Sequence, residues 1–83
     1  MASKRKSSDS DPRGRDPRVE SFGRRLRQLR QGFGWSQEHL AELADLDRSF
    51  VSGLERGEQV PSLISIHKLA HALGCPPADL VGD

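Results

Sequence analysis

His67, His71 and Cys75 are the residues best suited to hold a metal ion, because they follow one another at intervals of four. At that spacing the three side chains would align on one face of a continuous α-helix, and imidazole and thiolate are ligands that zinc prefers. Gly74 is expected to end the helix before Cys75, since glycine commonly occupies the left-handed position after a helix. We therefore expect no metal site and no other cofactor.

Catalysis is the second chemistry to consider. Serine, histidine and acidic residues are all present, but no motif holds a nucleophile beside a general base. The chain has 83 residues, 5% of them aromatic, and a mean hydropathy of -0.66, so its core is modest and leaves little material for the walls of a substrate pocket. We predict that the protein is not an enzyme.

The basic residues favour a polyanionic partner. Up to residue 18, six Lys and Arg face three Asp, whereas from residue 19 on seven basic residues face nine acidic ones. Four of those seven are clustered within one short stretch. They are Arg24, Arg25, Arg27 and Arg30. A local positive patch on a mildly acidic domain is therefore expected.

The first 18 residues mix Lys, Arg, Ser, Asp, Pro and Gly with almost no apolar side chain, so we predict a flexible basic arm at 1–18 and one domain at 19–83. The arm could add affinity through phosphates or be only a solvated linker. No segment is apolar enough for a membrane span or a secretory signal, and the single cysteine fits a reducing compartment. The expected location is the cytoplasm.

Apolar residues recur at intervals of three and four in four segments, and none alternates with a period of two. The expected buried faces are Phe22, Leu26, Leu29 and Phe33; Leu40, Leu43 and Ala44; Phe50, Val51 and Leu54; and Leu63, Ile66, Leu69, Ala70 and Leu73. Ser36 and Asp47 are expected N-caps, Pro61 opens a later helix, and Gly57 and Gly74 are expected stops. The fold is therefore predicted to be all-α, a compact bundle of four to five short helices.

The second and third of these helices are joined by only three or four residues. A steep crossing of two such helices needs a small residue in the first one, and Ala41 stands at that position. The turn also needs a residue that tolerates positive φ, and Asp45 enters that region more readily than most residues other than glycine. Residues 36–56 are therefore predicted to form a helix-turn-helix.

The sequence resembles the lambda-repressor-like, or Xre/Cro-type, family of helix-turn-helix regulators. The resemblance covers about 60 of the 83 residues in order. It is carried by Arg25-Leu26-Arg27-x-Leu29-Arg30, by Trp35-Ser36-Gln37-Glu38-x-Leu40-Ala41, by Ser52-Gly53-Leu54-Glu55-Arg56-Gly57 and by Pro61-Ser62-Leu63. Within the family, residues 48–63 look most like the controller proteins of restriction-modification systems. Asp45, where glycine is usual, and the long basic arm depart from that pattern.

The resemblance implies a sequence-specific regulator of transcription that lays its second motif helix in the major groove of duplex DNA. The base-reading residues would be Arg48, whose guanidinium can donate two hydrogen bonds to guanine, together with Ser49 and Ser52. The implied contacts to the DNA backbone are Gln37, Phe50, Arg56, Arg25 and Ser36. Each of these has a simpler interpretation, as a solvated or helix-capping residue or, for Phe50, as part of the core.

Glu55 is assigned to structure, because the matching Glu of the family pairs with an Arg at the end of the first helix, here Arg30. A carboxylate facing the groove would repel phosphates, so burial against Arg30 is the better use for it.

A domain of this size reads few base pairs, so a homodimer on a pseudo-palindromic operator is expected. Its interface is predicted from the apolar residues in excess of one small core. These are Ile64, Leu69, Leu73, Leu80 and Val81. No small-molecule effector is expected. Two alternatives stay open: a phage-type or general Xre-type repressor, and an antitoxin-like module that binds protein.

Overall fold

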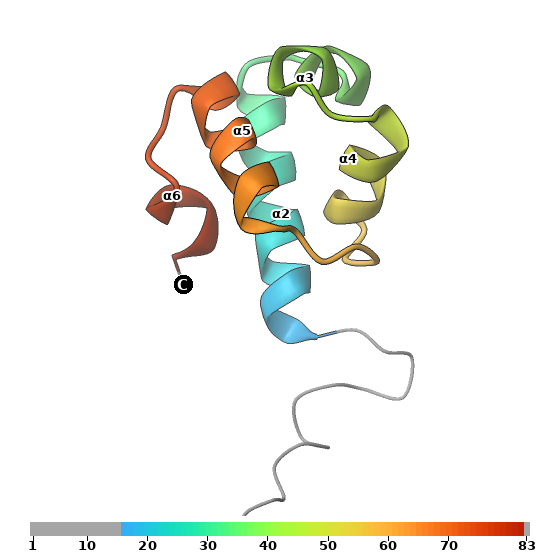
Figure 1. Cartoon of the computed structure of the whole chain (residues 1–83), viewed down its shortest axis with the longest axis vertical. Coiled ribbons are helices and arrows are strands. Elements are labelled where there is room, and N and C mark those ends of the chain that lie inside the picture. The colour runs from blue at the N-terminus through green and yellow to red at the C-terminus, as the bar shows by residue number, and fades with distance from the viewer. Residues whose placement is uncertain (1–15, 83) are drawn as a thin grey trace, which may run out of the picture.

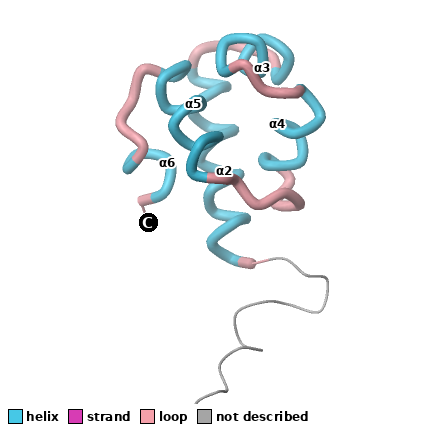
Figure 2. The backbone as a smooth tube through the Cα atoms, in the orientation of Figure 1, coloured by secondary structure: helices cyan, strands magenta, loops and turns pink. Residues whose placement is uncertain are grey.

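The computed structural model describes residues 16–82, which form five α-helices and no strand (Figures 1 and 2). The helices are α2 (Pro17–Gly32), α3 (Gln37–Ala44), α4 (Arg48–Glu55), α5 (Leu63–Leu73) and α6 (Ala78–Val81). Figure 1 shows α2 running through the middle, α3 lying across one end, α4 on one side of α2, and α5 with α6 on the other. The predicted all-α bundle is confirmed.

The first helix begins earlier than the apolar pattern indicated. Asp16 caps it by accepting a hydrogen bond from the backbone N–H of Arg18 at 2.8 Å, and Pro17 takes the first helical position, where its missing N–H is no loss. The helix thus begins two residues before the predicted domain boundary after residue 18, because a polar cap rather than an apolar residue starts it. The remainder of the predicted arm, residues 1–15, lies outside the described residues.

The core is formed by the inner faces of all five helices. Its most buried side chains are Leu26, Leu40, Val51, Leu54, Leu69 and Leu80. Three residues expected on buried faces are instead exposed: Phe33, Leu43 and Leu63. Phe33 follows the end of α2 at Gly32, so it no longer continues the helical stripe and stacks on Trp35 instead, with ring centroids 4.3 Å apart.

The close crossing of α2 and α4 depends on Gly23. A Cβ atom at this position would lie 2.2 Å from the carbonyl oxygen of Leu54 and 3.0 Å from that of Glu55. Both obstacles are backbone atoms, which cannot rotate away as a flexible side chain can. The absence of a side chain at Gly23 therefore sets how closely α4 lies against α2.

Among residues 16–82, no helix is both long enough and apolar enough to cross a lipid bilayer.

Candidate nucleic-acid interface

The turn between α3 and α4 is built on the residue predicted for it. Asp45 has φ 57° and ψ 49°, and it is the only residue other than glycine with positive φ in residues 16–82. The next N–H, that of Leu46, donates to the carbonyl of Ala41 at 2.9 Å, which satisfies the end of α3. The Asp45 carboxylate lies 3.7 Å from the ammonium of Lys68 on α5, so the turn is also attached to the next helix.

The core holds α4 by one face and leaves its first turn in solvent. Val51 and Leu54 are fully buried, whereas Arg48 and Ser49 are exposed. Phe50 is half-buried and packs against the core, so only part of its ring is open to a partner. The first turn of α4 is therefore accessible to a partner such as the major groove of DNA, while the buried face of the helix is held by the core.

A buried ion pair fixes the far end of α4. Arg30 donates from Nε to Glu55 Oε2 at 2.7 Å and from Nη2 to Oε1 at 2.9 Å, and its Nη1 donates to the carbonyl of Trp35 at 2.6 Å. The Glu55 side chain is only 2% exposed. The pairing raises the pKa of Arg30, chiefly through its side-chain hydrogen bond to Glu55. The predicted pair is present, and it joins the end of α2 to the end of α4.

Gln37 is part of the same network. Its Nε2 donates to Glu55 Oε1 at 3.0 Å, so one of its two amide hydrogens is already engaged in the protein. The residue before it, Ser36, is exposed and accepts the backbone N–H of His39 as the cap of α3. Gln37 can offer a phosphate only its second hydrogen, a restriction that the sequence does not reveal.

Ser52 of α4 and Arg56, the residue that follows the helix, contact each other. Arg56 donates from Nη1 to the hydroxyl of Ser52, and its Nη2 lies 3.0 Å from Glu58. Because the Ser52 oxygen accepts from Arg56, its own hydrogen is available to an outside acceptor. Arg25, on α2, is half-buried.

The residues predicted for a dimer interface are divided by the structure. Leu69, Leu73 and Leu80 belong to the core of the single chain, so the expectation that they form an interface is corrected. The sequence holds more apolar residues than a core of four helices would need. The fifth helix, α6, packs against α2 and α5, so these three side chains are buried within the single chain. Ile64 and Val81 are exposed. Sequence reasoning missed two more exposed apolar residues nearby in the chain, Val60 and Leu63.

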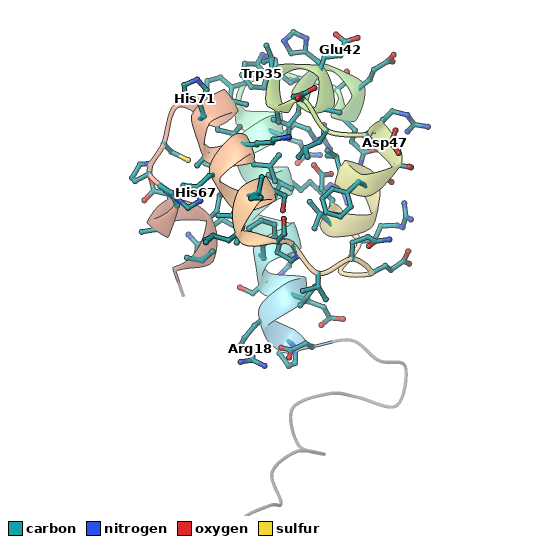
Figure 3. The ribbon with its side chains drawn as sticks, in the orientation of Figure 1. Arg18, Trp35, Glu42, Asp47, His67 and His71 are labelled. Atoms are coloured by element: carbon teal, nitrogen blue, oxygen red, sulfur yellow. The ribbon has the colours of Figure 1, made fainter. Side chains whose placement is uncertain are left out.

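The histidines do not converge with the cysteine. His67 and His71 project from the side of α5 that faces away from α4 (Figure 3). Gly74 ends α5 with φ 70°, as predicted, and Cys75 lies beyond it, where burial raises the pKa of its thiol. Within residues 16–82 no three His, Cys, Asp or Glu side chains gather closely enough to hold a metal ion.

Two short helices joined by a turn of positive φ, the second exposing its first turn, define a helix-turn-helix. The chain belongs to the helix-turn-helix family HTH_3, whose model matches residues 26–80. This is a family of DNA-binding regulators of transcription and not of enzymes, so the prediction for the class of protein is confirmed.

Several relatives are named control or controller proteins. Control protein C.BamHI of Bacillus amyloliquefaciens is 44% identical over 61 residues, which cover 72% of this chain and 75% of that protein. Control protein C.MunI of a Mycoplasma species is 36% identical, over 75% of this chain and 85% of the relative. The crystal structure of the restriction-modification controller protein C.AhdI from Aeromonas hydrophila superposes with a TM-score of 0.73 at 53% identity, covering 75% and 94% of the two chains.

Proposed function

We propose that the protein is a controller of a restriction-modification operon, which binds a specific duplex DNA operator as a homodimer in the cytoplasm. The observation that carries this proposal is the exposed first turn of α4, with Arg48 and Ser49 in solvent, on a helix whose other end is held by the buried Arg30–Glu55 pair. The similarity to control proteins supports the choice of operon.

Arg48 is proposed to read guanine, because a guanidinium donates two parallel hydrogen bonds that match the O6 and N7 acceptors. Ser52 would donate to a base or phosphate with the hydrogen that Arg56 leaves available. The second amide hydrogen of Gln37 would bind a phosphate beside the N-terminus of α3. Arg56 and Arg25 would add phosphate contacts from either side.

The exposed apolar residues around α5 support a dimer. Val60 and Val81 line one hollow of about 530 Å³ together with Pro17, Val19 and Phe22. Ile64, on α5, does not line this hollow but is a further exposed apolar residue, with 69% of its surface in solvent. A two-fold pairing through this face would bring two copies of α4 to neighbouring major grooves, which are about 34 Å apart in B-DNA.

Selection of bound sequences from a random duplex pool tests the DNA-binding proposal. We expect a pseudo-palindromic motif, and affinity for it that falls about 10³-fold or more between 50 and 200 mM salt if six or more phosphates are contacted. The motif should occur upstream of restriction-modification genes in the source genome. Absence of both a motif and salt dependence would contradict the proposal and favour a protein-binding module.

Sedimentation of an Ile64→Asp variant tests the interface. Because Ile64 is largely exposed, we expect a folded monomer that binds the operator more weakly. Leu43→Asp is the matched control, since Leu43 is also an exposed apolar residue but lies on α3, and it should remain a dimer. A dimeric Ile64→Asp variant would contradict the assignment of this face.

A further inference from the structure

The Asp47 carboxylate is oriented unusually for a residue that precedes a helix. Asp47 is the N-cap of α4, with φ -75° and ψ 138°, yet its side chain makes no capping hydrogen bond to the backbone of the helix. Instead, Oδ2 accepts from the hydroxyl of Ser49. Asp47 is exposed, and Figure 3 shows it at the start of α4 on the outer side of the molecule. The carboxylate is therefore presented beside Arg48, where a base edge would lie.

A carboxylate in this place must meet a hydrogen-bond donor when DNA binds. The phosphates that flank the groove repel it, and its own helix supplies no backbone donor to it. The donors that the major groove offers are the exocyclic amines of cytosine and adenine. A carboxylate at this end of α4 is therefore best accommodated on sequences that place such an amine opposite it.

The two amines differ in what stands next to them. Adenine presents the N7 acceptor beside its N6 amine, so a carboxylate bound there would bring a second oxygen against a lone pair. Cytosine presents its N4 amine with no acceptor on the same base, and the nearest acceptor, O6 of the paired guanine, is already hydrogen-bonded to that amine. The acceptor-only chemistry of a carboxylate therefore fits cytosine and disfavours adenine.

We propose that Asp47 reads a cytosine in each half-site, with Ser49 as a positioning residue that holds Oδ2 and leaves Oδ1 to the base. This assignment rests on the proposed function of α4 as the recognition helix. Under this proposal Ser49 does not contact a base directly but orients the carboxylate of Asp47. The start of α4 then carries two opposite charges, Arg48 to bind guanine and Asp47 to bind cytosine.

The decisive variant is Asp47→Asn, which keeps the shape and the capping preference of the residue but can donate as well as accept. An amide pairs with both N6 and N7 of adenine, so we expect the preference at one position to change from cytosine to adenine by about tenfold. Base selection from a random pool and binding to single-substitution duplexes measure this change. Melting temperature, followed by circular dichroism, should stay the same.

Glu42→Gln is the matched control, because it also replaces an exposed carboxylate by its amide. Glu42 projects from the outer side of α3, away from α4 (Figure 3). It should share any general gain in affinity from the lost negative charge but leave the base preference unchanged. Ser49→Ala should lower the discrimination for cytosine about fivefold, the order of one hydrogen bond, and leave the preference for guanine intact.

Two results would overturn the proposal. One is an Asp47→Asn variant that selects the same bases as the wild type, which would make Asp47 a solvated cap. The other is a folded Asp47→Asn variant that gains nothing for adenine while losing cytosine. Failure of the proposed function looks different, because the wild type would then enrich no motif at all.

Discussion

Replacing Gly23 by alanine tests whether backbone contact sets how closely α4 lies against α2. The new Cβ would lie 2.2 Å from the Leu54 carbonyl oxygen, whereas ordinary contact begins near 3.4 Å. Relief of the overlap therefore requires α2 and α4 to separate by about 1.2 Å, more than side-chain repacking can absorb in a close-packed core.

The magnitude follows from two opposing effects. Alanine favours the helix by about 1 kcal/mol relative to glycine. Overpacking typically costs about 1–3 kcal/mol, and here the obstacle is backbone on both sides, so the upper part of that range applies. We expect a net loss of about 2 kcal/mol, which lowers the melting temperature by about 10 °C in a domain of this size.

Urea unfolding followed by circular dichroism measures the effect, and Gly32→Ala provides the control. Gly32 lies in the same helix, and a Cβ there would meet no atom within 4 Å, so this variant should be neutral or more stable. If Gly23→Ala were as stable as Gly32→Ala, the inference that Gly23 sets the spacing of α2 and α4 would be wrong.

Three further predictions concern single residues. Arg48→Ala should leave stability unchanged and remove about 1–3 kcal/mol of discrimination at one guanine, measured by anisotropy on matched and mismatched duplexes. Glu55→Ala should lower the free energy of unfolding by about 3–5 kcal/mol, because it leaves the Arg30 charge buried and unpaired; a loss below 1 kcal/mol in urea would refute this. The pKa of Asp16 is lowered to about 2 by hydrogen bonds from the Arg18 side chain and backbone. Since the folded pKa lies below the unfolded one, the stabilisation is present above about pH 4 and lost as pH falls toward 2. Asp16→Ala should therefore show a smaller fall in melting temperature than wild type between pH 5 and pH 2.

Much of the fold could be read from local signals. Ser36 caps α3, Asp45 takes the left-handed turn and Gly74 ends α5, because each depends on a residue's own backbone preference. The start of α2 was equally readable from the Asp16–Pro17 pair, but a search for apolar periodicity passes over polar caps.

The contacts between distant segments could not be predicted in the same way. The residues next to Gly23 in the sequence do not show that a side chain is excluded at this position. The exclusion comes from the backbone of α4, which is distant in the sequence. The same holds for Gln37, whose amide is engaged by Glu55 from another helix, and for Leu80, whose burial requires α6 to fold back. Local signals therefore predicted the turn and the caps, whereas the number of apolar residues that a small core buries was underestimated, since Leu69, Leu73 and Leu80 all lie inside it.

The contact between Asp45 and Lys68 has a mechanical consequence. Lys68 is bound to the carboxylate of the turn and lies 3.4 Å from its carbonyl oxygen, and the same helix carries Ile64 on its outer surface one turn away. A displacement of α5 would therefore break the contacts of Lys68 with the turn between α3 and α4. If α5 pairs two copies, as proposed, one helix contacts both the partner and the turn that orients α4, so operators with one base pair inserted between the half-sites should bind more weakly.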